Sequence, residues 1–102
     1  MWRMRKKYRL SKRASQDLAG IWRYTLEKWS REQANIYVSG LLNACSLVAD
    51  CPTEMGRSYS HIQENYWTYH WGSHIIFYRI EKDNTVSVVR ILHERMDFDR
   101  HL

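Results

Sequence analysis

The sequence predicts an α+β fold in which two helices pack on a small antiparallel sheet, in the order β-α-α-β-β-β. Three observations lead to this prediction. Apolar residues recur at helical spacing in the first half of the chain, and the period changes to two in the second half. A serine stands at the expected start of each helix, where its hydroxyl can accept an orphan backbone N–H. Turn-forming residues separate short apolar segments near the C-terminus.

The first half of the chain predicts a short strand followed by a helical hairpin. Residues 7–10 can form the strand, and Ser11 begins the first helix. The segment Ser30-Arg31-Glu32-Gln33 has the pattern of a capping box, and it begins a second helix that Pro52 ends. Because the junction is short, we expect the helices to pack antiparallel. The residues expected on the inner faces are Ala14, Leu18, Ile21, Trp22, Thr25 and Trp29, and then Ala34, Tyr37, Val38, Leu41, Cys45 and Val48.

The second half predicts a loop and then three strands. The loop covers residues 53–60, where the pattern is polar and irregular. The expected strands are residues 62–70, 74–80 and 85–92, with turns at 71–73 and at Asp83-Asn84. Within residues 75–80 both alternating sets of side chains begin apolar, although a helical hairpin covers only one face of a sheet. The other face therefore needs cover, either from a partner chain or from the C-terminal tail or the loop after Pro52.

Composition favours one domain over residues 1–102, since 44% of the residues are apolar and the chain is long enough for one core. No apolar run approaches the roughly 20 residues that cross a bilayer, and no apolar segment follows the basic N-terminus. We therefore expect a cytosolic protein that does not contact a membrane. Cys45 and Cys51 fit neither a redox motif nor a zinc motif, so they are expected to be small buried residues. No cofactor is expected.

Positive charge is concentrated at the N-terminus. The net charge is +5, and seven of the first thirteen residues are Lys or Arg. Such a cluster can contact nucleic acid or an acidic partner, or it can simply be a solvated helix start. A DNA-binding module is disfavoured because no recognition helix stands out, so direct binding of nucleic acid is not the expected main function.

Three blocks of the sequence resemble the ParE branch of the ParE/RelE toxin superfamily. They begin at Tyr8-Arg9-Leu10-Ser11, at Gly72-Ser73-His74 and at Ile91-Leu92-His93. The resemblance implies a cytosolic toxin that a ParD-like antitoxin neutralises by folding its C-terminal segment onto it. It also implies that the toxin binds and inhibits DNA gyrase, with no reaction of its own. The chain departs from its relatives at Asn65-Tyr66-Trp67, where Trp67 replaces a cation and offers a flat stacking surface.

Two sets of residues are candidates for functional surfaces. Arg binds carboxylate or phosphate through two parallel hydrogen bonds, and Met offers adaptable apolar area, so the final strands and the exit of the last one supply the gyrase-binding candidates. These are Arg79, Arg90, His93, Glu94, Arg95 and Met96. Aromatic and apolar residues can anchor an incoming antitoxin segment. These candidates are Trp22, Tyr24, Trp29, Tyr37, Ile75 and Phe77, of which Trp22 or Trp29 is expected in the core.

The alternative function is the ribosome-dependent mRNA endonuclease of the sister RelE branch. RNA cleavage needs a base, an acid and cations. The residues that could supply them are His93, Glu94, Arg95, Arg79, Arg90 and His101. Adjacent His93 and Glu94 would, however, point to opposite faces of a strand, which disfavours catalysis.

No metal site is expected at His70 and His74, because a turn separates them and no carboxylate completes the set. Asp17 is expected to pair with Arg13 on the helix surface.

Overall fold

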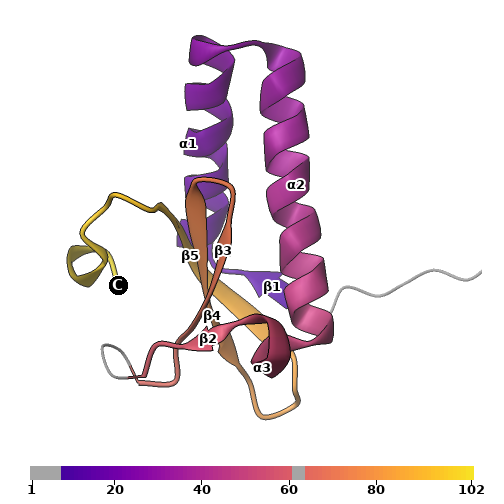
Figure 1. The fold of residues 1–102 in the computed structure, drawn as a ribbon, viewed down its shortest axis with the longest axis vertical. Coiled ribbons are helices and arrows are strands. Elements are labelled where there is room, and N and C mark those ends of the chain that lie inside the picture. Colours follow the sequence, from indigo (N-terminus) through magenta and orange to yellow (C-terminus); the bar gives the residue numbers. More distant parts are fainter. Residues whose placement is uncertain (1–7, 61–63) are drawn as a thin grey trace, which may run out of the picture.

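The computed structural model describes residues 8–60 and 64–102, so Lys7 and Ile62, the predicted first residues of two strands, lie outside the described part. A helical hairpin of α1 (Lys12–Lys28) and α2 (Arg31–Asp50) packs on one face of a five-stranded sheet (Figure 1). The predicted α+β fold is confirmed. The strands are β1 (Tyr8–Leu10), β2 (Arg57–Ser58), β3 (Trp67–Trp71), β4 (His74–Ile80) and β5 (Val86–His93). Within the described residues no helix is long and apolar enough to cross a membrane.

The strands lie in the order β1-β5-β4-β3-β2. Strand β1 runs parallel to β5, whereas all other pairs are antiparallel, so the prediction of a purely antiparallel sheet is wrong at this edge. The predicted loop over 53–60 is also partly wrong. Pro52 begins a short helix α3 (Pro52–Met55), because proline suits the first turn of a helix, and Arg57 and Ser58 then pair with β3.

The two predicted serine caps are confirmed, although no hydrogen bond from the Gln33 side chain completes the capping box among the described residues. The Ser11 hydroxyl accepts the N–H of Ala14 at 2.9 Å and donates to the carbonyl of Val89 at 2.7 Å, so it joins α1 to β5. The Ser30 hydroxyl accepts the N–H of Gln33 at 3.0 Å. Each serine therefore satisfies one of the orphan amides at a helix start.

The core lies between the hairpin and the inner face of the sheet. Its buried members are Tyr8, Ala14, Leu18, Leu41, Ala44, Cys45, Val48, Ala49, Ile76, Tyr78, Val86, Val88 and Ile91. Cys45 is buried, as predicted, and its burial raises the pKa of the thiol to about 12, whereas Cys51 is exposed, contrary to the prediction. The prediction of a core position for Trp29 is also wrong, because its side chain is 76% exposed. The hairpin rises past the sheet (Figure 1), so its tip has no second layer to pack against.

The outer face of the sheet is covered at Phe77. The ring of Tyr59 lies 5.5 Å from that of Phe77, and the ring of Phe98 lies 5.0 Å from it on the C-terminal tail. Phe98 begins a 3₁₀ helix (Phe98–Arg100). Of the two kinds of cover left open by the sequence, the loop after Pro52 and the tail therefore supply it here. Phe77 is fully buried, so it is not an exposed anchor for an antitoxin.

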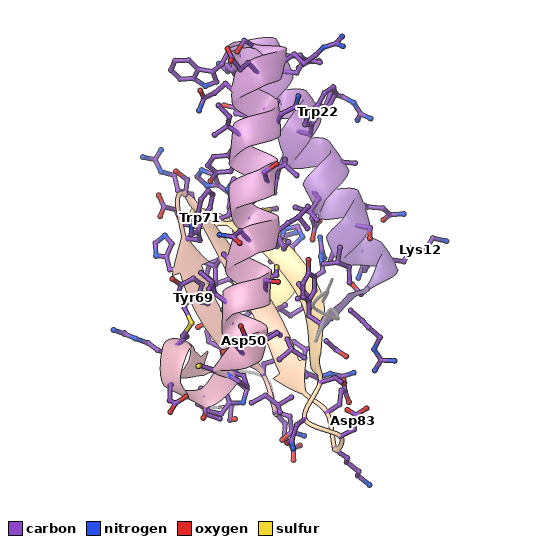
Figure 2. The ribbon with its side chains drawn as sticks, turned by 90° about the vertical axis from the view of Figure 1, so that its right-hand side faces the viewer. Lys12, Trp22, Asp50, Tyr69, Trp71 and Asp83 are labelled. Atoms are coloured by element: carbon purple, nitrogen blue, oxygen red, sulfur yellow. The ribbon has the colours of Figure 1, made fainter. Side chains whose placement is uncertain are left out.

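Helix α2 is held close to β3 by a glycine. A Cβ at Gly40 would collide with the indole of Trp71, so only glycine permits this approach. Figure 2 shows Trp71 and Tyr69 on the strand beside α2. The ring of Tyr37 lies 5.0 Å from that of Trp71, which fixes Tyr37 above the turn between β3 and β4.

Candidate functional site

The chain leaves β5 in a tight turn that exposes several candidate residues. We name the segment His93, Glu94, Arg95 and Met96 the tail turn. The N–H of Glu94 donates to the carbonyl of Ser73 at 3.0 Å, and the N–H of Met96 donates to the carbonyl of His93 at 3.0 Å. The N–H of Arg95 donates to Nδ1 of His93 at 3.1 Å. The backbone is thus fixed by His93 and Ser73, while the side chains of Glu94, Arg95 and Met96 remain exposed.

A groove of about 490 Å³ runs between α1 and the ends of β4 and β5. We name it the α1 groove. It is lined by Gln16, Asp17, Gly20, Ile21, Tyr24, His74, Ile91, Leu92, His93 and Met96. Tyr24 is 61% exposed and Met96 38% exposed, so two large apolar side chains flank its opening. A Cβ at Gly20 would meet nothing within 4 Å, so this glycine borders open space in the groove.

His74 forms the polar floor of the α1 groove. The Tyr37 hydroxyl accepts the N–H of Ser73 at 3.0 Å and shares a hydrogen bond with Nδ1 of His74 at 2.7 Å. The ring of His93 lies 5.3 Å from that of His74. Burial, and then the nearby imidazole of His93, lower the pKa of His74 from 6.5 to about 4. His74 is therefore neutral at pH 7 and shares its hydrogen bond with Tyr37 in that form.

This shift predicts a loss of stability in acid. The unfolded chain binds a proton at His74 below about pH 6.5, whereas the folded chain does so only near pH 4, so stability falls as the pH drops between these values. The full shift corresponds to about 3 kcal/mol, and solvent screening of the partly exposed ring reduces the expected loss to about 1–2 kcal/mol. We expect His74→Asn, whose amide can keep a hydrogen bond with the Tyr37 hydroxyl without titrating, to lose about 1–2 kcal/mol less than the wild type over this range. Urea unfolding at pH 7 and pH 4 measures this, and equal losses in both proteins would contradict it.

Glu94 contacts His70 on the face of the sheet that the helices do not cover. Its Oε1 lies 2.9 Å from Nε2 of His70, and both side chains are largely exposed. His70 pairs with Ile75 and His74 with Trp71, so the two histidines point to opposite faces. The side chains of His93 and Glu94 likewise point to opposite faces of the sheet, as the alternation of side chains along a strand predicts. Among residues 8–60 and 64–102, no group of three His, Cys, Asp or Glu side chains is arranged to hold a metal ion.

Arg90 is not a surface residue. Its Nε and one terminal nitrogen donate to the two carboxylate oxygens of Asp17 at 2.8 and 2.9 Å, and the other terminal nitrogen donates to the carbonyl of His101 at 2.7 Å. Only 11% of the Arg90 side chain and 14% of the Asp17 side chain are exposed. The Arg90 side chain is therefore engaged within the fold and is not displayed for a partner, and the expected pairing of Asp17 with Arg13 is wrong.

The position of Asp17 explains this pair. Strand β1 pairs with β5 only as far as Val88, so the β5 edge beyond it has no strand neighbour. Asp17 fills the gap, because its carboxylate also accepts the N–H of Ile91 at 2.9 Å. A buried amide and a buried guanidinium thus share one carboxylate. Arg90 in turn holds the C-terminal tail through His101, which ties α1, β5 and the tail together.

The antitoxin candidates fall into separate places. Tyr24 lines the α1 groove, and Tyr37 lies below it as the partner of His74. The indole N–H of Trp22 donates to Oδ1 of Asn35 at 2.8 Å and links the two helices, whereas Trp29 stands free at the hairpin tip. Ile75 is half-buried on the outer face beside His70. Of these candidates, Tyr24 lines the groove together with His93 and Met96 of the tail turn, and Tyr37 contacts the groove residue His74.

Arg79 lies at the other end of the sheet from the tail turn. It pairs with Ser87 near the start of β5, whereas His93 pairs with His74 at the end of that strand. Figure 2 places Asp83, in the turn between β4 and β5, at the end of the molecule remote from Trp22. Arg79 is exposed there and shares a hollow with Arg9. Arg9 and the groove residue Gly20 are absent from the sequence-based candidates, because their neighbours are set by long-range packing.

Comparison with known families gives a match over most of the chain. Residues 8–98 match the model of the ParE toxin of type II toxin–antitoxin systems. Toxin ParE1 of Mycobacterium tuberculosis is 39% identical over 99 residues, which cover 97% of this chain and the whole of that protein. Toxin ParE1 of Caulobacter vibrioides is 37% identical over 97 residues, covering 95% of this chain and 98% of that protein.

Solved structures share the fold. A chain of the chromosomal ParDE toxin–antitoxin system from P. aeruginosa superposes with a TM-score of 0.73 at 14% identity, covering 84% of this chain and 92% of that one. A chain of the RelBE2 toxin–antitoxin complex of Mycobacterium tuberculosis gives a TM-score of 0.56 at 20% identity, covering 84% of this chain and 94% of that one. At identities this low, the similarity of the structures shows a shared fold alone. With the family match and the relatives that align over nearly its full length, the chain belongs to the ParE toxin family of type II toxin–antitoxin systems.

Proposed function

We propose that this toxin arrests growth in the cytoplasm by binding DNA gyrase through its tail turn, without catalysing a reaction. The proposal rests chiefly on one observation: the tail turn displays Arg95 and Met96 to solvent on a backbone that three hydrogen bonds hold in place. A preformed turn loses little conformational freedom on binding. Arg and Met together suit a protein surface that offers both carboxylates and apolar area.

The arrangement of charged groups supports binding over catalysis. The residues that could cleave RNA do not converge on one point, because Arg90 is engaged by Asp17 and Arg79 lies at the opposite end of the sheet. His93 and Glu94 point to different faces. General acid–base chemistry requires groups within hydrogen-bonding reach of the same substrate. A ribosome-dependent endonuclease is therefore the second candidate, and its support is the likeness in fold to RelBE2.

Two assays on the purified toxin separate these functions. In the first, gyrase acts on plasmid DNA and the products are scored for loss of supercoiling and for trapped double-strand breaks. In the second, a reconstituted translation reaction is scored for cuts in the mRNA. We expect trapped breaks in the first assay and intact mRNA in the second. Cut mRNA together with unaffected gyrase would overturn the proposal in favour of the endonuclease.

We further propose that a ParD-like antitoxin places its C-terminal segment in the α1 groove. The exposed surface of the groove is mostly apolar, with Tyr24 and Met96 at its opening, which suits apolar anchors of an incoming peptide. Met96 belongs to both the groove and the tail turn. A peptide bound in the groove would therefore cover part of the surface proposed to bind gyrase, which gives a direct means of neutralisation.

A substitution at Gly20 tests the groove. Because a Cβ there meets nothing within 4 Å, Gly20→Arg should fold normally while its long side chain fills the groove. We expect antitoxin affinity to fall at least tenfold, about 1.4 kcal/mol. The matched control is Ala19→Arg, which adds the same charge at an exposed neighbour outside the groove lining.

The measurement is titration calorimetry with the product of the reading frame that precedes the toxin gene, after thermal melting has shown both variants folded. Equal affinities for Gly20→Arg and Ala19→Arg would remove the α1 groove as the antitoxin site.

A further inference from the structure

Three neighbouring strands place two arginines on either side of a serine. Arg9 on β1 pairs with Ser87 on β5, and Arg79 on β4 pairs with the same Ser87. Residues in register on adjacent strands lie on the same face of a sheet, with strands about 4.8 Å apart, so the two arginines start about 10 Å from each other. We name this set the arginine row. The short Ser87 side chain between them leaves a gap bordered by two guanidinium groups.

The arginine row lies on the outer face of the sheet. The neighbours of Arg9 along β1, Tyr8 and Leu10, pair with Val86 and Val88, which are buried beneath the helices. Side chains alternate along a strand, so Arg9 and Ser87 face the other way. The side chain of Arg79 is 49% exposed. The helical hairpin therefore does not cover the row.

An aromatic ring borders the same hollow. Tyr66, immediately before β3, lines a concavity of about 340 Å³ together with the arginine row. Its neighbour Trp67 pairs with Tyr78 and packs against the core, so Tyr66, and not the Trp67 expected from the sequence, borders this hollow. The hollow thus combines two guanidinium groups, a hydroxyl and a phenol ring.

Two carboxylates compete weakly for the arginines. Glu81 lies 3.5 Å from Arg79, with both side chains substantially exposed, and such pairs contribute little. Asp83 is engaged by the Thr85 hydroxyl at 2.6 Å and by the Thr85 N–H at 3.1 Å. These hydrogen bonds, with a smaller contribution from the charge of Arg9, lower the pKa of Asp83. Within the described part of the chain Arg9 forms no salt bridge, so it is available to a ligand.

We propose that this hollow binds one nucleotide of a single-stranded nucleic acid. The phosphate lies between Arg9 and Arg79, the Ser87 hydroxyl donates to it, and the base stacks on the ring of Tyr66. Arginine forks match phosphate geometry, and aromatic rings stack on bases of any sequence. A single strand is required because bases in a duplex are already stacked on both sides. The site lies at the opposite end of the sheet from the tail turn, so it does not depend on the gyrase proposal.

Fluorescence anisotropy of the full chain tests the proposal. The probes are labelled oligothymidylate and oligouridylate of about 12 nucleotides, a length within the site size of single-strand-binding modules. We expect Arg9→Ala with Arg79→Ala to weaken binding about tenfold or more. The slope of log affinity against log salt should fall in magnitude by about 0.7, because the two arginines contact the same phosphate and each phosphate contact on a single strand contributes about 0.7. The matched control is Arg23→Ala with Arg31→Ala, which removes two exposed charges from the helical hairpin. An equal loss in this control would overturn the proposal.

Substitutions around the hollow test the stacking and the competing carboxylate. We expect Tyr66→Ala to weaken binding about fivefold or more and Tyr66→Phe, which keeps the ring, to bind like the wild type. Glu81→Gln should tighten binding up to about fivefold by removing the competing charge. The two oligonucleotides distinguish DNA from RNA as the source, and preference for either supports the site. If polyglutamate displaced the labelled probe as effectively as unlabelled oligonucleotide does, the proposal would be overturned in favour of an acidic peptide. Binding of duplex DNA with the same affinity as the single strands would also overturn the proposal.

Discussion

The double substitution Arg95→Ala with Met96→Ala is expected to abolish growth arrest. Both side chains are exposed, and the backbone of their turn is fixed by the carbonyl and Nδ1 of His93. Alanine retains these backbone contacts, so the turn should persist without its contact groups. Truncating a hot-spot residue of a protein interface costs about 2 kcal/mol or more, so if both side chains are hot spots, as proposed, the pair should lower target affinity by about three orders of magnitude.

The expected result is measured as gyrase inhibition in the presence of plasmid DNA, with growth after induced expression as the second readout. The control is Arg100→Ala with Leu47→Ala, which removes an exposed cation and an exposed apolar side chain from surfaces outside the tail turn. Because Met96 also borders the α1 groove, Arg95→Ala alone is the variant that should keep full antitoxin affinity. Full toxicity of the double variant, with the protein present at normal level, would remove the tail turn as the effector surface.

The helices were accessible to sequence reasoning because their determinants are local. Ser11 and Ser30 each satisfy an amide three residues later, so the start of each helix is encoded within four residues. The inner faces follow from helical spacing, and Leu41, Cys45 and Val48 are buried as predicted. The spacing fails only at Trp29, because periodicity identifies a face but does not reveal where the opposing sheet ends.

Strand β5 contains a β-bulge, and the sequence shows a matching change in the alternation of apolar residues. Val86 and Val88 are apolar at even positions, whereas Ile91 continues the buried set at an odd one. The change of phase marks a β-bulge, since Phe77 pairs with Arg90 but Tyr78 pairs with Val88, which leaves Val89 as the extra residue. In the sequence this change appears as apolar residues in both alternating sets of side chains. A strand that is buried on both faces gives the same pattern, so the sequence alone does not identify the bulge.

The candidate sites were predictable only in part. The tail turn is a continuous segment, so its residues were found together. The arginine row is assembled from β1, β4 and β5 and depends on the parallel pairing of β1 with β5, which strand alternation does not specify. The same limit applies to Asp17, whose nearest cation in sequence is Arg13 but whose partner lies 73 residues away. Long-range pairs of this kind follow from the topology of the sheet.

Arg90→Ala is expected to destabilise the fold by about 3–5 kcal/mol, since it removes one partner of a largely buried ion pair. The Arg90 side chain is 11% exposed, and its guanidinium makes three hydrogen bonds, two to Asp17 and one to the carbonyl of His101. Its loss leaves the Asp17 carboxylate with the N–H of Ile91 as its remaining partner in β5. Arg79→Ala is the matched control, because it removes an exposed arginine from the adjacent strand and should change stability by about 0.5 kcal/mol or less.

Urea unfolding of Arg90→Ala, Asp17→Ala and the double variant measures how far the two side chains act as a unit. We expect the double variant to lose about 2 kcal/mol less than the two single losses combined, because the second substitution removes the charge that the first left unpaired. The carbonyl of His101 loses its donor in Arg90→Ala but keeps it in Asp17→Ala. Limited proteolysis should therefore cut the C-terminal tail faster in the first variant than in the second, at equal fractions unfolded. Additive losses and equal cleavage would mean that Arg90 neither depends on Asp17 nor holds the tail.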